Sequence, residues 1–129
     1  MDKLEYIPGD LATWNGNIVT IENSDGYYAT YYDEDEFLQE INVNEIKGIP
    51  LTPEILEKNG WYGATHSKQS DDSTKILYKT FKRKGYPTIK VSQDLKITCE
   101  LSPFIVKLES VSDLQHLLFG LGINHEMEV

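Results

Sequence analysis

The first fifty residues alternate short runs of β-branched and aromatic side chains with turn-forming residues. Asn15-Gly16 is the strongest two-residue hairpin signal in the chain, because both residues tolerate positive φ. The predicted strands cover residues 11–14, 17–21, 27–32 and 37–41, followed by a short helical turn at residues 42–46. Short strands at such close spacing predict a small curled sheet in the manner of an SH3-like barrel.

A short helix is predicted after this sheet, over residues 52–59, because both of its ends carry strong signals. Thr52 is a good N-cap, Pro53 suits the first helical position, and Glu54 places negative charge at the positive end of the helix dipole. Gly60 can adopt the left-handed conformation that ends a helix. A helix this short needs tertiary packing to be stable.

The next residues predict an antiparallel meander that starts at Trp61-Tyr62. Residues 75–81 alternate as a strand does, and residues 82–85 predict a hairpin turn in which Gly85 takes the strained position. Residues 66–73 contain no apolar side chain, so we expect them to form a loop. Further strands are predicted over residues 86–91, 95–101 and 104–108.

A second, amphipathic helix is predicted near the end of the sequence. Ser110 can cap it, and Asp113 occupies the capping-box position three residues later. Its apolar stripe consists of Val111, Leu114, Leu117, Leu118 and Leu121. We expect this stripe to close the open face of the second sheet.

The predicted fold class is therefore α+β, with two parts. Residues 1–50 are expected to form a small SH3-like β subdomain. Residues 51–129 are expected to form the helix, the antiparallel sheet and the C-terminal helix. A chain of 129 residues suits one compact unit overall.

The net charge of −9 is unevenly distributed along the chain. Residues 1–65 hold 3 lysines and 13 acidic residues, whereas residues 75–107 hold 8 basic residues against Asp94 and Glu100. The content of 40% apolar and 26% charged residues is that of a globular protein. The charged start and the lack of long apolar runs predict a cytoplasmic protein without a membrane partner.

Two segments resemble a known family. Residues 49–61, I-P-L-T-P-E-I-L-E-K-N-G-W, resemble the segment I-P-L-T-x-E-x-L-x-K-x-G-F, and residues 111–122, V-S-D-L-Q-H-L-L-F-G-L-G, are similar to the ending V-H-x-L-Q-N-L-Y-F-A-L-T-G. Both occur, in this order, in small uncharacterised proteins of gut Bacteroidetes genomes and their integrated phages and mobile elements. Asp113, His116 and Gly120 depart from the pattern. The resemblance implies a fold and a genomic setting, and no activity.

No catalytic, cofactor-binding or metal-binding residue is predicted. The three histidines lack partners at ligand spacing, residues 33–36 lack the oxygen spacing of a calcium loop, and no glycine-rich phosphate loop occurs. Cys99, the single cysteine, falls among alternating apolar positions, so we expect a buried core thiol. An enzyme site formed only in three dimensions stays open.

A basic hairpin is the first candidate surface, because its cations alternate with Phe81 and Tyr86. Its possible nucleic-acid contacts are Lys79, Lys82, Arg83, Lys84 and Lys90. Cations can contact phosphates, and aromatic rings can stack on bases. Against this, the net charge repels a polyanion, and lysines also protect edge strands from aggregation.

Two further surfaces suggest protein contacts. Among Tyr27, Tyr28, Tyr31 and Tyr32, alternation places one pair inside the small barrel and leaves the other to be covered or exposed. On the C-terminal helix, a possible interface away from the apolar stripe consists of Gln115, His116 and Phe119. The alternative for this flank is packing under residues 123–129.

We therefore expect a non-catalytic interaction or accessory protein of phage or mobile-element origin. It would act through protein surfaces, as a homodimer or with a partner protein. The alternatives are a nucleic-acid-binding module that uses the basic hairpin, and an enzyme with an unrecognised site.

Overall fold

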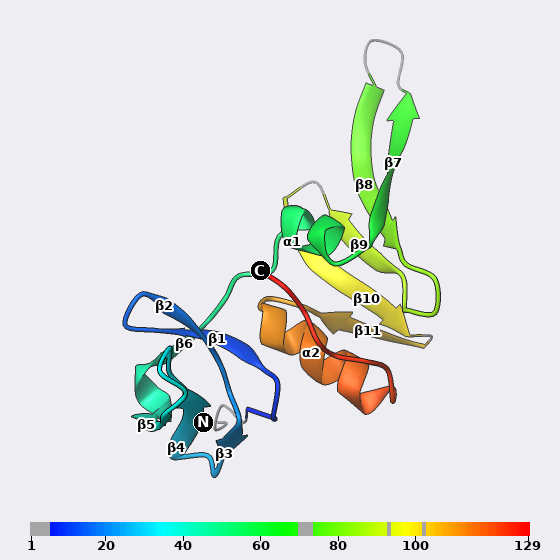
Figure 1. Ribbon diagram of the computed structural model, residues 1–129. Helices are drawn as coiled ribbons and strands as arrows, with labels where there is room; N and C mark the ends of the chain where they lie inside the picture. Colours follow the sequence, from blue (N-terminus) through cyan, green and yellow to red (C-terminus); the bar gives the residue numbers. More distant parts are fainter. Residues whose placement is uncertain (1–5, 70–73, 93, 102) are drawn as a thin grey trace. The chain divides into compact units, whose positions relative to one another are not determined.

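The computed structural model describes residues 6–69, 74–92, 94–101 and 103–129. It confirms the α+β class, with three antiparallel sheets and two α-helices (Figure 1). The chain forms two compact units. Unit 1 comprises Met1–Pro50 and Ser110–Met127, and unit 2 comprises Leu51–Glu109 and Glu128–Val129.

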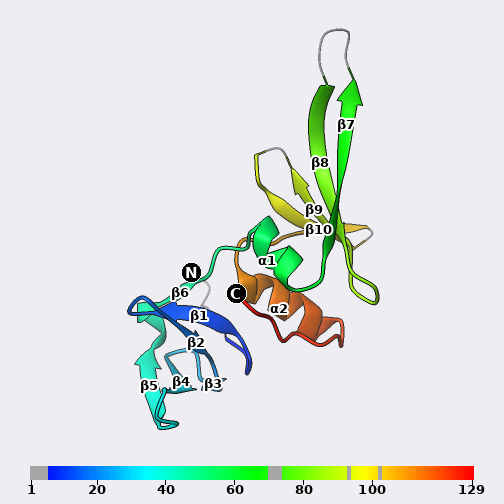
Figure 2. The ribbon, with the colours of Figure 1, turned by 45° about the horizontal axis from the view of Figure 1, so that its top comes forward.

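Unit 1 contains two three-stranded sheets (Figure 2). The strands are β1 (Leu11–Trp14), β2 (Asn17–Thr20), β3 (Asn23–Ser24), β4 (Tyr28–Tyr32), β5 (Leu38–Asn42) and β6 (Ile46–Gly48). Their orders are β2-β1-β6 and β3-β4-β5, and the 3₁₀ helix η1 (Val43–Glu45) joins β5 to β6. Consecutive strands β2 and β3 thus pass from one sheet to the other, which is the topology of an SH3-like barrel.

The first hairpin of unit 1 forms as predicted. Trp14 pairs with Asn17, and the two residues between them have positive φ, 51° at Asn15 and 80° at Gly16. Alternate residues of the strands then point into a common core. The core consists of Tyr6, Ala12, Val19, Ile21, Ala29, Ile41, Val43 and Ile46.

Helix α2 (Val111–Gly120) also belongs to unit 1. Its predicted capping box is present, because the Ser110 hydroxyl accepts from the Asp113 amide and the Asp113 carboxylate accepts from the Ser110 amide. The expectation that α2 groups with the second sheet, within residues 51–129, is wrong. The apolar stripe shows that the helix has an inward face, but it does not show which sheet that face covers.

Unit 2 begins with helix α1 (Pro53–Lys58), whose ends are those predicted. The Thr52 hydroxyl accepts from the Ile55 amide at 3.2 Å, and Gly60 has a φ of 92°. A five-stranded meander follows, in the order β11-β10-β9-β8-β7. The strands are β7 (Tyr62–Gln69), β8 (Thr74–Lys82), β9 (Ile89–Ser92), β10 (Ile97–Leu101) and β11 (Phe104–Lys107).

The loop predicted over residues 66–73 is wrong for residues 66–69, which lie in β7. This strand pairs with β8 as far as Gln69 with Thr74, so backbone pairing extends a strand whose sequence has no apolar signal. Residues 70–73 lie outside the described residues. Since β9 pairs only with residues 78–81 of β8, the β7–β8 hairpin extends beyond the rest of the sheet (Figure 2).

The inner face of the meander forms the core of unit 2. Phe81, Ile89 and Cys99 are neighbours across β8, β9 and β10, and all three are fully buried. Trp61 is also buried, and its indole N–H donates to the Pro87 carbonyl oxygen at 3.3 Å. Neither α1 nor α2, the helices of the described residues, has the length and apolarity needed to cross a membrane.

The burial of Cys99 confirms its predicted core position, and it sets an alkaline limit to stability. Burial raises the pKa of the Cys99 thiol above its ordinary value of 9.0, because the thiolate would lose its hydration. The neutral thiol therefore stabilises the fold at neutral pH, and this stability is lost as pH rises above the pKa of the unfolded chain.

We expect Cys99 to resist alkylation by iodoacetamide in the native protein and to react fully in concentrated guanidinium chloride. We also expect the Cys99→Ala variant to lose less stability than the wild type between neutral and alkaline pH, as measured by urea unfolding. Tyr6, whose pKa is also raised by burial, contributes equally to both proteins. Identical alkaline losses in the two proteins would contradict this role of Cys99.

Candidate binding surfaces

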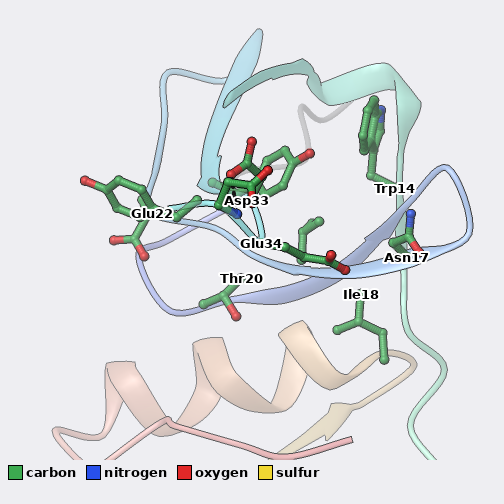
Figure 3. Close-up of a pocket in the computed structure, with 11 residues that line it drawn as sticks. Trp14, Asn17, Ile18, Thr20, Glu22, Asp33 and Glu34 are labelled. Carbon is green, nitrogen blue, oxygen red and sulfur yellow. Dashed lines mark hydrogen bonds between the residues drawn. The ribbon is translucent and has the colours of Figure 1, made fainter. Parts of the chain in front are cut away.

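A groove of about 600 Å³ lies in unit 1, between β2 and the chain that follows β4 (Figure 3). Its lining consists of Trp14, Asn17, Ile18, Val19, Thr20, Glu22, Tyr31, Tyr32, Asp33, Glu34 and Asp35. Four of these side chains are carboxylates, three are aromatic and none is basic. We call this feature the acidic groove.

The aromatic part of the acidic groove is held by the barrel itself. The rings of Trp14 and Tyr31 are half-buried, with centroids 5.9 Å apart, and both pack against the core of unit 1. The Trp14 indole N–H also donates to a carboxylate oxygen of Glu45 at 3.3 Å. Because β1 and β4 position these rings before any ligand arrives, binding to them requires little ordering.

The acidic part of the groove is shaped by Asp33. Its Oδ1 accepts from the amides of Asp35 and Phe37, both at 2.9 Å, and its Oδ2 accepts from the Gln39 side chain at 2.8 Å. The bond from Phe37, followed by that from Gln39, lowers the pKa of the Asp33 carboxyl. The Asp33 carboxylate therefore stabilises the turn after β4. The neighbouring carboxylates of Glu34 and Asp35 are exposed and line the groove.

The outer face of the β3-β4-β5 sheet exposes large apolar side chains next to this groove. Tyr32 and Leu38 are register partners and are 57% and 55% exposed. Tyr28, four residues before Tyr32, lies on the same face of β4. Phe37, in the adjoining loop, is also exposed. We call these four residues the aromatic face. Tyr32 belongs to both features, so the aromatic face is continuous with the acidic groove.

The tyrosine prediction is correct for three of its four residues. Tyr28 and Tyr32 share the outer face, and Tyr31 packs against Trp14 from the inner face. Tyr27, which alternation placed on the face of Tyr31, is exposed because it precedes β4, which begins at Tyr28.

The five predicted nucleic-acid contacts are divided by the sheet of unit 2. Lys82 and Lys90 lie on its outer face, whereas Lys79 lies on the face of Phe81 and Ile89. Lys84 is exposed in the turn after β8. The sequence placed all of these cations on one hairpin, and the pleat separates them.

Arg83 packs within unit 2. Its guanidinium carbon lies 3.9 Å from the centroid of the Tyr86 ring and 5.2 Å from that of Trp61. Cation–π contacts of this kind stabilise the turn between β8 and β9. Arg83 is therefore a structural residue of the hairpin first, and it is only partly exposed for a ligand.

Lys107 is a further basic residue on this outer face, outside the hairpin that the sequence indicates. It pairs with Thr98, which in turn pairs with Lys90, so the register brings Lys107 near the hairpin cations. The alternation of residues 104–108 indicates its face, but no local signal shows which strands lie beside it.

The flank of α2 predicted as a possible interface is largely engaged within unit 1. Gln115 is fully buried and therefore not available for an interface, which agrees with the alternative of packing under residues 123–129. Its side chain accepts from the Leu11 amide at 2.8 Å and donates to the carbonyls of Gly9 at 2.8 Å and His125 at 3.1 Å. It thus joins α2 to the chain before β1 and to the chain after the helix.

The other two residues of this flank differ from each other. His116 Nε2 lies 2.5 Å from Oδ2 of Asp10, a fully buried carboxylate that also accepts from the Ile7 amide. Phe119 is exposed, and its ring packs edge-on against that of His125, with the ring centroids 5.3 Å apart. An interface role therefore remains a prediction for Phe119 alone, and the Asp10–His116 pair holds α2 in place.

Among the described residues, no group of three or more histidine, cysteine, aspartate or glutamate side chains is placed to hold a metal ion. The carboxylates of the acidic groove are spread along its wall or used in the Asp33 turn. The arrangement of rings and carboxylates is instead suited to binding organic cations.

Comparisons of the chain with models of protein families, with curated proteins and with solved structures found no match.

Proposed function

We propose that the protein is a non-catalytic interaction protein that binds a partner protein through unit 1. The observation that carries the proposal is the aromatic face, where Tyr28, Tyr32 and Leu38 are exposed on one side of a small sheet and Phe37 is exposed in the adjoining loop. Large exposed apolar patches mark interaction sites, and aromatic residues are enriched in the cores of interfaces. The resemblance to proteins of phages and mobile elements suits an accessory role of this kind.

The acidic groove supports a basic partner segment. A lysine or arginine side chain that enters the groove would meet the faces of aromatic rings and the carboxylates of Glu34 and Asp35. Unit 1 as a whole carries 13 acidic residues against 2 lysines, a net charge of −11. Such a field speeds the encounter with a basic partner and disfavours acidic ones.

The test is the selection of random peptides, displayed on a library, for binding to the immobilised full-length chain. We expect the enriched peptides to carry lysine or arginine beside an apolar residue. We expect Leu38→Asp to weaken their binding at least tenfold in fluorescence polarisation, because it removes an apolar contact from the centre of the aromatic face. The matched control is Phe104→Asp, which places the same charge on an exposed apolar position of unit 2.

The charge requirement has its own pair of variants. Glu34→Lys should weaken the same peptides, whereas Glu57→Lys, the same change on the exposed side of α1, should leave them unaffected. Enriched peptides that bind Leu38→Asp as tightly as wild type would contradict the proposal. Self-association that Leu38→Asp abolishes would identify a second copy of the chain as the partner.

A further inference from the structure

The outer face of the five-stranded sheet of unit 2 presents lysines and tyrosines to solvent. Phe81, Ile89 and Cys99 point into the core, so their neighbours along each strand point outward. The outer-face residues whose side chains the structure describes are Tyr62, Tyr78, Thr80, Lys82, Lys90, Ser92, Thr98, Glu100, Ile105 and Lys107. We call this surface the lysine face.

Strand register sets the spacing of its three lysines. Thr80, Lys90, Thr98 and Lys107 form one row across β8, β9, β10 and β11. Neighbouring strands lie about 4.8 Å apart, so the backbone positions of Lys90 and Lys107 are roughly 10 Å apart. Lys82 lies two residues along β8 from Thr80, which places all three cations within reach of one strand of a polyanion.

Two aromatic rings lie among these cations. Tyr62 pairs with Lys82 and is 80% exposed, although it lies in a paired strand. Tyr78 supports Lys90, whose ammonium nitrogen lies 4.2 Å from the centroid of the Tyr78 ring. One lysine is thus held in position, and one ring is open to stacking.

We propose that the lysine face binds single-stranded nucleic acid, with phosphates at Lys82, Lys90 and Lys107 and a base stacked on Tyr62. An exposed ring beside cations on an open sheet offers a stacking surface together with backbone neutralisation, which are the two contributions that single strands use. The bases of a duplex are already stacked on each other, so the Tyr62 ring would have no partner there. Glu100 is the one acidic side chain among the described residues of this face.

The net charge of the chain does not prevent this contact. The excess of acidic residues lies in unit 1, whereas unit 2 holds 10 basic and 8 acidic residues, a net charge of +2. The cations of the lysine face therefore belong to a unit whose own net charge is positive.

The experiment measures binding of the full-length chain to a fluorescently labelled oligothymidylate by anisotropy, in a series of salt concentrations. We expect a dissociation constant on the order of 10 µM at low salt. The logarithm of the association constant should fall with log[salt] with a slope of about −2, as three phosphate contacts on a single strand predict. Lys90→Glu and Lys107→Glu should each weaken binding at least tenfold. Tyr62→Ala should weaken it at least about fivefold through lost stacking.

Two control variants separate the lysine face from general charge and general aromatic content. Lys79→Glu makes the same charge change on the opposite face of β8. Phe104→Ala removes a 71% exposed ring on the opposite face of β11. Both should bind as wild type does, and each variant's fold can be verified by circular dichroism.

The remaining outcomes would overturn the proposal. No binding at low salt would exclude the site. Equal losses for Lys79→Glu and Lys90→Glu would show that charge alone, without this face, attracts the oligonucleotide. Duplex DNA or heparin that binds as tightly as the single strand, with no effect of Tyr62→Ala, would show attraction to polyanions without recognition of bases.

Discussion

The Phe81→Ala variant should lose about 3–5 kcal/mol of unfolding free energy, the cost of truncating a fully buried aromatic side chain. Phe81 lies on the inner face of β8, next to Ile89 of β9 and opposite Gly63 of β7. Truncation would leave a cavity where three strands meet, and paired strands cannot collapse to fill it. Urea unfolding of the two proteins in a Trp14→Phe background, followed by the fluorescence of Trp61, which is buried in the same unit, measures this loss.

Gly63 allows a sharper test of the same packing. A Cβ atom at position 63 would lie 2.9 Å from Cε1 of Phe81, so Gly63→Ala should cost about 1–3 kcal/mol by overpacking. The shorter side chain of Phe81→Leu should relieve that clash, and the double variant should cost less than the sum of the two single changes. Strictly additive losses would show that Gly63 and Phe81 do not contact each other.

Gly120 provides the matched control for this substitution. It ends α2, and a Cβ atom there would meet no atom within 4 Å. Gly120→Ala should therefore stabilise the protein, by a few tenths to about 1 kcal/mol, through helix propensity. The same chemical change thus has opposite signs at two positions, and packing decides the difference.

Gln115→Leu should destabilise the protein by about 2–4 kcal/mol, because it removes the partner of one buried and one partly buried backbone group. The leucine would fill a similar volume, but the Leu11 amide and the Gly9 carbonyl would lose the side chain that satisfies them. Each unsatisfied buried group costs about 1–3 kcal/mol. The loss is measured by thermal or urea unfolding at neutral pH.

Gln39→Leu is the control for the loss of a glutamine. Gln39 is exposed and makes a side-chain hydrogen bond to Asp33, so its replacement should cost less than about 1 kcal/mol. Equal effects of the two substitutions would mean that Gln115 is not a buried connector in solution.

Features that depend on a few neighbouring residues could be predicted from the sequence. Asn15-Gly16 determines the geometry of its hairpin through the φ values of these two residues. Thr52 caps α1, and Ser110 with Asp113 caps α2, through hydrogen bonds between residues three positions apart. The alternation around Cys99 likewise indicates a buried face, since the side-chain period of a strand is fixed. The SH3-like topology followed from the spacing of such local signals.

Features that depend on distant pairing could not be predicted. Gln115 has an ordinary helical position in the sequence, and its burial follows from the Leu11 amide, 104 residues away. Strand β7 extends through polar residues because β8 supplies its hydrogen bonds. Lys107 joins the lysine face, and Lys79 leaves it, only once register and pleat are known. The acidic groove likewise forms when the turn after β4 lies against β2.

Because residues 51–109 interrupt unit 1, its two segments are synthesised at different times. Within unit 1, Pro50 forms a β-bridge with Ser110, and the Ile49 carbonyl accepts from the Val111 amide at 2.8 Å. Within unit 2, the Leu51 amide donates to the Glu109 carbonyl at 3.1 Å. On the ribosome, β1–β6 emerge before α2, so the barrel lacks its helix while the meander is synthesised.

Folding of the meander would lower the entropic cost of bringing α2 to the barrel. Joining Pro50 to Ser110 in a disordered chain would require closing a long loop, whose entropic cost rises with its length. Once unit 2 has paired Leu51 with Glu109, the two halves of unit 1 are connected through a closed structure. Folding of the inserted sheet would thus reduce this entropic cost, and a nascent chain released before residue 110 would leave the barrel without the Gln115 connector.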